Sequence, residues 1–473
     1  MSTFPPDLFR GRRFAVLGLG KNGLPAAHAL AAMGAEVVAW DDNEKARAAS
    51  TPSFPSAPPS WPGAKGLGAT GQGDGPAKPG HGGGEDSITL RDPTADPGFR
   101  FDALVLSPGI PHRLPNPHPA AVRAREAGVP ILSDTELLYR AVRGAGSKAR
   151  FAGITGTNGK STTTALLAHI LVEAGVTAAA GANLGPAALS LPLLPQDAVY
   201  VLEMSSYMLE RIDTLRFDAA AMLNLSADHL DRHGDMAGYA SAKRAIFARQ
   251  TAGDLAVIGV DDAGSQAMAD WLDTRPARVA RVSGQDRPLA QGPALPGAHN
   301  AQNAAAATVM ARFFGVSDDA IAAGLRSFPG LPHRQQRIVT VDGITFVNDS
   351  KATNADAAER ALVCYDRLIW IAGGMAKEGG IEPLVPLFPR IARAILIGRD
   401  APQFAATLTR EGVPFDMVGT LDAAVPAAFA AAKDADAPIV LLSPACASWD
   451  QFTGYDQRGD RFAEIARSLA GGA

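Results

Sequence analysis

A glycine-rich stretch in the second quarter of the chain contains the residue types that bind phosphate. A short apolar run over 151–154 leads into Gly-Thr-Asn-Gly-Lys-Ser at 156–161, and a helical pattern follows over 161–175. In a strand, turn and helix of this kind, the backbone N–H groups of the turn and the helix N-terminus attract phosphate oxygens. Lys160 is placed to reach terminal phosphate oxygens, and the Ser161 hydroxyl is placed to face Mg²⁺. The stretch therefore predicts a nucleotide phosphate site.

The stretch departs from the general P-loop pattern at one position. The pattern has a glycine five residues before Gly159, and this chain has Ile154 there. The alternative is an ordinary turn between a strand and a helix, in which Lys160 points into solvent.

Two further residues follow apolar strands and can take part in phosphate chemistry. Glu203 follows the run 198–202, and His229 comes a few residues after the run 219–223. Continuous apolar strands that alternate with helices indicate a parallel sheet covered on both faces, and ligands gather at the carboxyl ends of such strands. A carboxylate and an imidazole beside a triphosphate suit a metal-assisted phosphoryl reaction. The alternatives are a helix cap for Glu203 and a backbone-bonded loop residue for His229.

Other polar residues have no clear function by their spacing alone. Lys243 lies on a predicted helix over 236–248, where a lysine is most often solvated. Asn300 and Asn303 lie one turn apart on another predicted helix, where they could contact a purine edge or cap the helix. Cys446 has no histidine near it in the sequence, which favours a buried structural cysteine.

The N-terminal part resembles a dinucleotide-binding unit. A strand over 14–17 leads into Gly-Leu-Gly-Lys-Asn-Gly at 18–23, and a second strand ends at Asp41-Asp42. The same fold also binds nucleotides without redox chemistry, so a hydride-transfer role stays an alternative. Ser107-Pro108-Gly109 follows a strand over 102–106 and is a second loop that could face a ligand; an ordinary turn is its alternative.

Composition narrows the class of protein. The chain has 473 residues, of which 47% are hydrophobic and 19% charged, so several globular domains are expected. A formal net charge of −4 indicates neither nucleic acid nor an anionic membrane as a partner. The N-terminal arginines precede an apolar run too short for a signal peptide, and no run is long enough to span a bilayer. A soluble cytoplasmic protein is expected.

The patterns predict an α/β fold with three domains. The first, at 1–140, is Rossmann-like; the second, at 141–330, is a P-loop-type ATPase domain with a parallel sheet; and the third, at 331–473, is again Rossmann-like with an open parallel sheet. Residues 51–98 are rich in glycine, proline, serine and alanine, so they are predicted to form a mobile loop inserted in the first domain.

As a set, the polar loops resemble the Mur ligase family, and within it the branch that adds D-glutamate. The resemblance covers nearly all of the chain except about 51–98. It rests on Gly-Thr-Asn-Gly-Lys-Ser at 156–161, Glu-Met-Ser-Ser at 203–206, Asp-His-Leu-Asp-Arg at 228–232, His-Asn-Ala-Gln-Asn at 299–303, Pro-His-Arg at 332–334, Asn-Asp-Ser-Lys-Ala-Thr-Asn at 348–354 and Ser-Pro-Ala-Cys-Ala-Ser at 443–448.

The resemblance implies an ATP-dependent amide ligase of peptidoglycan precursor synthesis. Its substrates are UDP-N-acetylmuramoyl-L-alanine and D-glutamate, the intermediate is an acyl phosphate, and the products include ADP and phosphate. It implies two Mg²⁺ ions, a carbamylated lysine at Lys243, a monomer, a cytoplasmic location, and closure of the last domain onto the ATP site.

The resemblance also implies roles for individual residues. Those matching the catalytic positions are Lys160, Glu203, His229 and Lys243, and the metal ligands are Ser161, Glu203, His229 and the Lys243 carbamate. Those matching the ATP site are Gly156, Thr157, Asn158, Gly159, Lys160, Ser161, Thr162, Asn300, Asn303, Arg334, Asp349 and Lys351. Those matching the two substrate sites are Asn22, Asp42, Asn43, Ser107, Pro108, Gly109, Asn183, Ser205, Thr353, Lys377, Ser448 and Tyr455.

The chain departs from the family pattern at three places. Met208 stands where the family often has glutamine, Asp42-Asn43 replaces a more usual Thr-Arg, and 51–98 has no counterpart. Two other functions stay open at this stage. One is a ligase for another acceptor such as L-glutamate, and the other is a nucleotide-sensing protein that binds the ligands without turnover.

Overall fold

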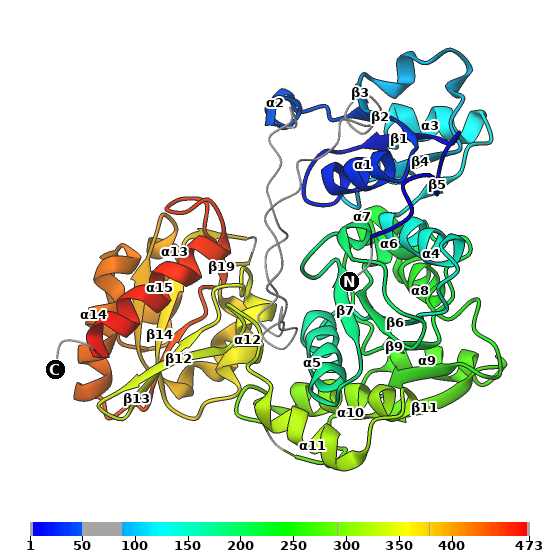
Figure 1. Ribbon diagram of the computed structural model, residues 1–473. Coiled ribbons are helices and arrows are strands. Elements are labelled where there is room, and N and C mark those ends of the chain that lie inside the picture. Colours follow the sequence, from blue (N-terminus) through cyan, green and yellow to red (C-terminus); the bar gives the residue numbers. More distant parts are fainter. Residues whose placement is uncertain (1–2, 50–87, 291, 378, 471–473) are drawn as a thin grey trace, which may run out of the picture. The chain divides into compact units, whose positions relative to one another are not determined.

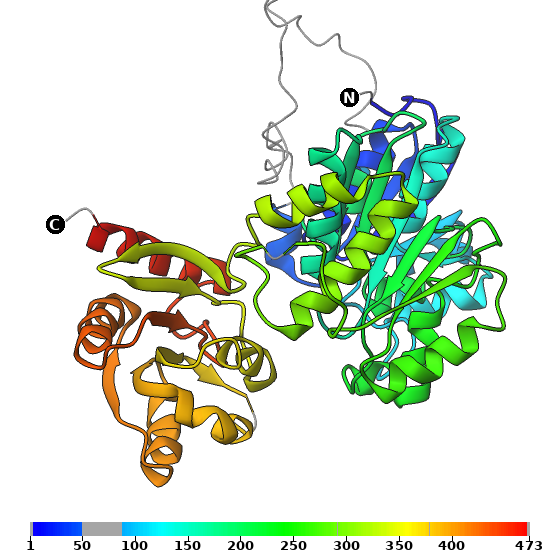
Figure 2. The ribbon, with the colours of Figure 1, turned by 90° about the horizontal axis from the view of Figure 1, so that it is seen from below.

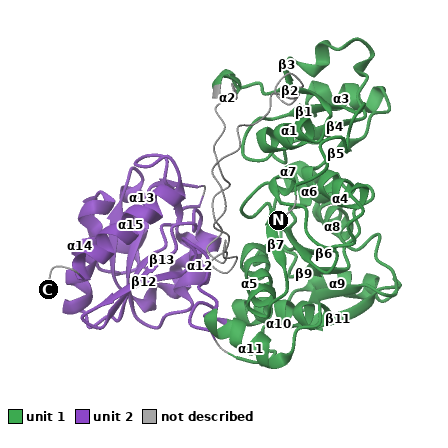
Figure 3. Ribbon diagram, in the orientation of Figure 1, with its two compact units in different colours: residues 1–291, 298–327 green, residues 292–297, 328–473 purple. Residues whose placement is uncertain are grey.

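The computed structural model describes residues 3–49, 88–290, 292–377 and 379–470. The chain divides into two compact units, one of residues 1–291 and 298–327 and one of residues 292–297 and 328–473 (Figure 3). The first unit contains two sheets and the second contains one large sheet and a two-stranded one. The predicted α/β fold with parallel sheets is confirmed. The predicted boundaries near 140 and 330 divide the chain more finely and stay a prediction.

The N-terminal sheet is parallel and has the strand order β3-β2-β1-β4-β5 (Figure 1). Its strands are β1 (Arg13–Leu17), β2 (Glu36–Trp40), β3 (Ile88–Leu90), β4 (Ala103–Leu106) and β5 (Ile131–Leu132), with helices α1 (Gly23–Ala32), α2 (Glu44–Ala49), α3 (Pro119–Glu126) and α4 (Asp134–Gly144). Strands β2 and β3 lie on one side of β1, and β4 and β5 lie on its other side, so the order in which strands are added to the sheet changes direction at β1. The loops after β1 and β4 therefore meet at a crevice that suits a ligand.

The predicted insertion is wrong at its C-terminal boundary. Residues 50–87 lie outside the described residues, but 88–98 do not form a loop throughout, because β3 pairs in register with β2. Two short 3₁₀ turns follow, at Pro93–Ala95 and Pro97–Phe99, and Phe99 is buried. The sequence Ile-Thr-Leu at 88–90 suits an edge strand, and the composition of its neighbours concealed it.

The middle sheet is also parallel, with the order β11-β10-β9-β6-β8-β7. Its strands are β6 (Arg150–Thr155), β7 (Ala178–Ala182), β8 (Val199–Glu203), β9 (Ala219–Met222), β10 (Leu255–Gly259) and β11 (Arg278–Val282). Its helices are α5 (Lys160–Glu173), α6 (Ser206–Leu209), α7 (Leu230–His233), α8 (Met236–Arg244), α9 (Ala263–Leu272), α10 (Ala298–Phe313) and α11 (Asp318–Ser327). Helices cover both faces (Figures 1 and 2), as the fully buried strands β8 and β9 require.

The large sheet of the second unit has the order β12-β13-β18-β14-β16-β17. Its strands are β12 (Gln336–Val341), β13 (Ile344–Asn348), β14 (Leu368–Gly373), β16 (Ile391–Ile397), β17 (Phe415–Gly419) and β18 (Ile439–Leu442); β15 (Met375–Ala376) and β19 (Cys446–Ala447) form the small sheet. The helices are α12 (Ala355–Leu362), α13 (Ala401–Arg410), α14 (Leu421–Asp434) and α15 (Tyr455–Ala470), with a 3₁₀ segment at Glu382–Arg390. Two separate apolar cores pack against this sheet.

The open parallel sheet predicted for the last domain is confirmed for β13, β18, β14 and β16, but one edge strand, β12, was not predicted. Strand β12 is antiparallel to β13, and the two form a hairpin around Asp342-Gly343. Both turn residues have positive φ, 49° and 79°, which is the conformation of a type I′ turn. The dipeptide Asp-Gly between two alternating runs is the signal that identifies such a hairpin.

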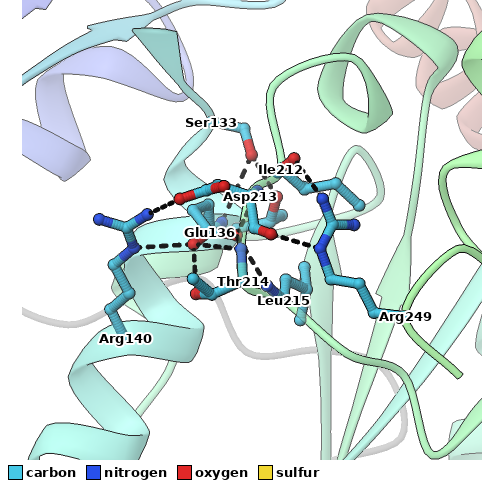
Figure 4. A network of polar contacts seen from close by, with 9 residues as sticks. Ser133, Glu136, Arg140, Ile212, Asp213, Thr214, Leu215 and Arg249 are labelled. Atoms are coloured by element: carbon cyan, nitrogen blue, oxygen red, sulfur yellow. Dashed lines mark hydrogen bonds and ion pairs between the residues drawn. The ribbon is translucent and has the colours of Figure 1, made fainter. Parts of the chain in front are cut away.

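The sequence Ser-Asp-Thr-Glu at 133–136 has the spacing of a capping box, and α4 does begin there, but its glutamate has another partner (Figure 4). Ser133 Oγ accepts a hydrogen bond from Glu136 N at 3.3 Å, as an N-cap does. In a capping box Glu136 would bind the N–H of Ser133. That N–H instead donates to Arg211 O at 2.9 Å, and the Glu136 carboxylate binds the segment 213–215.

Within the described part of the chain, none of the helices has both the length and the apolar character of a membrane span.

Candidate functional site

The glycine-rich turn lies between the central strand β6 and helix α5. Gly159 is the N-cap of α5 and has φ of 82°, a conformation that glycine adopts at little cost. A Cβ atom at Gly159 would also overlap with the Oδ1 atom of Asn303, which lies on α10. The turn therefore packs directly against α10, and both its shape and its packing require glycine at this position. The predicted residues Asn300 and Asn303 are buried there, with Asn303 Nδ2 donating to Asn300 Oδ1 at 3.0 Å.

Asn224, just after β9, fixes the turn from the neighbouring strand. Its backbone oxygen accepts from Thr157 N at 3.0 Å, and its side chain forms two bonds with the backbone of Asn158, at 2.8 and 3.2 Å. Thr157 Oγ1 also donates to Ser226 O at 3.1 Å. The sequence pattern did not single out Asn224 as a site residue, although its place after a strand adjacent to β6 was the available signal.

Two lysines converge on the turn. Lys160 Nζ donates to Gly156 O at 2.9 Å and to Thr157 O at 2.7 Å, and Lys243 Nζ donates to the same Gly156 oxygen at 2.9 Å. Lys243 also lies 3.3 Å from Thr155 Oγ1 and is 1% exposed, so the expectation of a solvated lysine on α8 is wrong. Burial, and then the charge of Lys160, hold the pKa of Lys243 well below its ordinary value. This environment therefore favours the uncharged amine over the ammonium form.

Glu203 ends β8 and is buried beside the turn. Its Oε1 accepts from Asn183 Nδ2 at 2.6 Å, whereas its Oε2 is buried and has no hydrogen-bond partner among the residues that the structure describes. Glu203 does not cap α6, because Ser205 Oγ accepts from Met208 N and fills that role. A buried carboxylate oxygen without a donor is the arrangement that a divalent cation satisfies.

His229 lies in the loop after β9 with φ of 54° and starts α7. Its Nε2 lies 3.4 Å from Asp228 Oδ2, and its ring lies 5.0 Å from that of Tyr207. Burial lowers the pKa of His229, opposed by Asp228 and assisted by Lys160, so a neutral ring is available as a metal ligand. Among the described residues, no group of three or more histidine, cysteine, aspartate or glutamate side chains could hold a metal on its own. A metal here therefore needs other donors, such as Ser161 or phosphate oxygens.

The predicted nucleotide-sugar site lies at the crevice of the N-terminal sheet. Ser107 Oγ donates to Gly18 O at 2.8 Å, which joins the loop after β4 to the glycine turn after β1. A Cβ atom at Gly23 would overlap with the Gly18 carbonyl oxygen, so the first turn of α1 requires glycine there. Asp41 Oδ2 accepts from Leu19 N at 2.7 Å and fixes the turn from β2. The two predicted loops are thus adjacent. Pro108, which follows Ser107, is half-buried, and Gly109 is exposed.

Three predicted residues of this site already have partners within the protein. Asp42 accepts from Trp40 Nε1 at 3.1 Å and lies 2.9 Å from His118 Nε2. Asn43 Oδ1 accepts from Lys45 N at 3.0 Å. Asn22 Nδ2 lies 3.4 Å from Asp134 Oδ2, and burial raises the pKa of Asp134 to about 6.

In the second unit the predicted ATP residue Asp349 is buried after β13. Its Oδ1 accepts from Gln335 N at 3.1 Å and its Oδ2 from Ser443 Oγ at 2.8 Å. Burial raises the pKa of Asp349 to about 7, although both hydrogen bonds and the charge of Arg334 oppose the shift. Asp349, Arg334 and the loop after β18 therefore lie together.

The predicted amino-acid pocket is also in the second unit. Lys351 Nζ donates to Tyr455 OH at 3.0 Å, which joins a predicted ATP residue to a predicted substrate residue. Thr353 N donates to Lys351 O at 2.9 Å, Ser448 is buried after β19, and Lys377 follows β15.

Arg458 of α15, which the sequence pattern missed, holds these loops together. It donates to Ser350 Oγ at 2.9 Å, Ser350 O at 2.8 Å and Cys446 O at 3.1 Å. Cys446 is itself buried, as expected. Met208, which stands where the family often has glutamine, is fully buried in the apolar core.

Comparison with known proteins agrees with this arrangement. The family model of the Mur ligase middle domain matches residues 154–291, and that of the Mur ligase glutamate ligase domain matches residues 333–446. The chain is 47% identical over 490 residues to the UDP-N-acetylmuramoylalanine–D-glutamate ligase of Paramagnetospirillum magneticum, covering 98% of this chain and 99% of that one. It is 44% identical over 493 residues to the ligase of the same name from Rhodospirillum rubrum, covering 98% and 96%.

Solved structures show the same fold at lower identity. The UDP-N-acetylmuramate–alanine ligase MurC of Thermotoga maritima has a TM-score of 0.54 at 16% identity, covering 97% of this chain and 99% of that chain. MurF of Acinetobacter baumannii has a TM-score of 0.51 at 18% identity, covering 71% and 81%.

Proposed function

The chain belongs to the Mur ligase family, and from this membership we propose how its residues carry out the reaction. It is an ATP-dependent ligase that joins D-glutamate to UDP-N-acetylmuramoyl-L-alanine in peptidoglycan synthesis. The observation that carries the proposal is the group around the turn after β6: two lysines on one carbonyl oxygen and a buried glutamate with an unpartnered oxygen.

The proposed reaction has two steps. The carboxylate of the muramoyl-alanine attacks the γ-phosphorus of ATP, which gives an acyl phosphate and ADP. The uncharged amine of D-glutamate then attacks the acyl carbon, phosphate leaves with the bonding electron pair, and the amine loses a proton to form the amide. Both steps bring anions together, so the site must neutralise negative charge.

Lys160 supplies positive charge at the phosphates. Its ammonium group now donates to two carbonyl oxygens of the turn, and phosphate oxygens can take their place. The N-terminus of α5 and the turn around Gly159 hold the phosphates next to it.

Mg²⁺ ions, where bound, would neutralise phosphate and carboxylate oxygens in both steps. The unpartnered Oε2 of Glu203 fits one such ion together with Ser161. We assign His229 and a carbamate of Lys243 to a second ion, in keeping with the low pKa of the His229 ring.

Carbamylation of Lys243 is supported by its surroundings. An uncharged amine can attack CO₂ to form a carbamate with loss of one proton, and the buried Lys243 has the lowered pKa that this requires. A carbamate would also place a negative charge beside Lys160, with which the Lys160 ammonium group could pair.

The second unit supplies the remaining contacts in this proposal. Arg334, Asp349 and Lys351 serve ATP, while Thr353, Lys377, Ser448 and Tyr455 serve D-glutamate. The uridine diphosphate binds at the crevice of the N-terminal sheet, at the glycine turn and Ser107–Gly109. A monomer acting in the cytoplasm stays a prediction.

A comparison of acceptors tests the function. Phosphate release is measured with ATP, Mg²⁺ and UDP-N-acetylmuramoyl-L-alanine, with D-glutamate or L-glutamate as acceptor. We expect release with D-glutamate only, and a Lys160→Ala variant should reduce it by about 10²- to 10³-fold because the charge at the phosphates is lost. The exposed Lys148→Ala, near the other end of β6, is the matched control and should keep the activity. Equal rates with both acceptors, or none with either, would contradict the proposal.

A further inference from the structure

Arg211 is a buried arginine in the segment after α6, with 2% of its surface exposed. Its guanidinium donates to three carbonyl oxygens of one loop: Nη1 to Leu106 O at 2.9 Å and to Ser107 O at 3.0 Å, and Nη2 to Ile110 O at 2.6 Å. Its Nε lies 3.4 Å from His112 Nδ1. Burying a charge is costly unless it is hydrogen-bonded, so these charge-assisted bonds tie Arg211 firmly to residues 106–110.

A second arginine binds the same loop from its exposed side. Arg232 Nη1 donates to Gly109 O at 3.0 Å, and its Nη2 lies 3.4 Å from Ile110 O. Its guanidinium lies over the ring of Tyr207, 4.3 Å from the centroid. Together the two arginines engage the carbonyl oxygens of Leu106, Ser107, Gly109 and Ile110.

The backbone around Arg211 is fixed by the Glu136 network in Figure 4. Arg211 O accepts from Ser133 N at 2.9 Å. The buried Glu136 carboxylate accepts hydrogen bonds from Asp213 N, Thr214 N, Thr214 Oγ1, Leu215 N and Arg140 Nε, at distances between 2.6 and 3.1 Å. On the other side of the segment, Arg249 donates to Ile212 O and Asp213 O. Arg211 therefore starts from a rigid base and can hold the loop in one position.

The position of this loop matters for an anionic ligand. Carbonyl oxygens carry partial negative charge, and the two guanidinium groups neutralise four of them while adding positive potential behind the loop. Ser107 remains bonded to the glycine turn through Gly18 O, at 2.8 Å, and Gly109 is exposed. A loop held in this way meets a diphosphate without first reorganising.

We propose that Arg211, assisted by Arg232, is a positioning residue that preforms the loop 106–110 for the diphosphate of the nucleotide sugar. It determines the affinity for that substrate and leaves the chemical steps unchanged. The inference rests on the proposed function, because that function places the nucleotide sugar at this crevice. Arg211 follows β8 and α6, and Arg232 lies on α7 after β9, in the same loops as Glu203 and His229. Loops of the middle sheet therefore hold a binding loop of the N-terminal sheet in place.

Steady-state kinetics and calorimetry test the proposal. Arg211→Gln, Arg211→Lys, Arg232→Gln and the control Arg249→Gln are compared with the wild type. KM is measured for UDP-N-acetylmuramoyl-L-alanine, ATP and D-glutamate, and binding is measured calorimetrically with UDP as probe. Arg249 is the matched control because it binds the same segment but does not contact the loop.

For Arg211→Gln we expect KM for the nucleotide sugar and Kd for UDP to rise about tenfold, because buried carbonyl groups lose their donors. Arg211→Lys should raise both by about threefold, since a lysine keeps the charge but cannot bridge three oxygens. In both variants kcat and the KM for ATP should stay within about twofold of the wild type, as should all values for Arg249→Gln.

Three results would overturn the proposal: unchanged KM and Kd in a folded Arg211→Gln, an equal rise in KM for ATP, or an equal rise in Arg249→Gln. If Arg211→Gln does not fold, Arg232→Gln, at a more exposed position, is the test. A rise in its KM for the nucleotide sugar and its Kd for UDP supports the proposal, and unchanged values contradict it. A wild type that binds UDP but does not ligate D-glutamate would reject the proposed function, while the UDP measurements would still test the arginines.

Discussion

Lys243 and Asp349 are buried ionisable residues whose surroundings oppose their ordinary charge. Lys243 has a strongly lowered pKa and Asp349 a raised one, in each case first because of burial. Groups of this kind cluster at functional sites, and both residues lie in predicted binding loops or beside them. At this scale, substitutions of these two side chains are the most informative.

The carbamate at Lys243 predicts chemical rescue by anions. Lys243→Ala should lose activity by about 10²- to 10³-fold, because one negative group of the site is removed. Added acetate should restore part of the phosphate release by occupying the space of the carbamate, whereas methylammonium should not. Rescue by methylammonium alone would show that the ammonium form is the functional one.

The buried Asp349 predicts a pH dependence of stability. Its pKa is about 7 in the folded protein, whereas that of an ordinary aspartate is 3.8, so the folded state binds an extra proton between these pH values. The free energy of unfolding therefore falls as pH rises through this window, by up to about 1.4 kcal/mol per pH unit.

Asp349→Asn removes this contribution. Relative to the wild type, the variant should be more stable at pH 8 than at pH 5 by on the order of 2 kcal/mol, measured by denaturant unfolding at both pH values. The exposed Asp434→Asn in the same unit is the control. The same difference at both pH values would mean that Asp349 is not the titrating group.

Helix α5 shows how one element combines backbone conformation with packing. Gly159 begins it and Gly175 follows its end, and their φ values, 82° and 80°, are nearly equal. A Cβ atom at Gly159 would overlap with Asn303, whereas a Cβ at Gly175 has nothing within 4 Å. The two positions therefore separate the cost of the backbone conformation from that of the contact with α10.

Gly175→Ala should cost about 1 kcal/mol of stability and leave the ligase active, because only the left-handed conformation is strained. Gly159→Ala should cost more and also raise the KM for ATP, because Asn303 must move away from the turn. Thermal unfolding and kinetics of both variants measure the difference. Equal effects of the two substitutions would show that the contact with Asn303 contributes little.

At the scale of the molecule, the predicted ATP residues are divided between the two compact units. Lys160, Asn300 and Asn303 belong to the first unit, and Arg334 and Asp349 belong to the second. The proposed set of ATP residues therefore draws on both units. The contacts of Arg211 and Glu136 instead join the N-terminal and middle sheets within one unit.

Closure of the last domain onto the ATP site, which the resemblance to the family implies, stays a prediction. Small-angle X-ray scattering should show a smaller radius of gyration with a non-hydrolysable ATP analogue, Mg²⁺ and UDP-N-acetylmuramoyl-L-alanine than without ligands. An Arg334→Met variant should show a weaker response, because one contact from the second unit is removed. Ligands that bind by calorimetry without any change in the scattering curve would argue against closure.

The sequence by itself determined the features that are local in the chain. Apolar runs such as 151–154 and 198–202 predicted parallel strands, and the glycine pattern at 156–161 predicted the turn, because φ preferences and side-chain periodicity depend on neighbouring residues. The two strands that it missed, β3 and β12, were also local features. One is a short strand beside a glycine- and proline-rich segment, and the other belongs to a hairpin with an Asp-Gly turn.

Only the tertiary structure decided which side chains are buried and what they contact. Lys243 was expected to be solvated by its spacing on a helix, yet the turn after β6, 87 positions away in sequence, encloses it. Glu136 has the spacing of a capping-box residue on its own helix, but segment 213–215 binds its carboxylate instead. Arg211 reaches a loop about a hundred residues earlier. Burial and partner choice depend on segments that meet only when the sheets have formed, so no local pattern contains them.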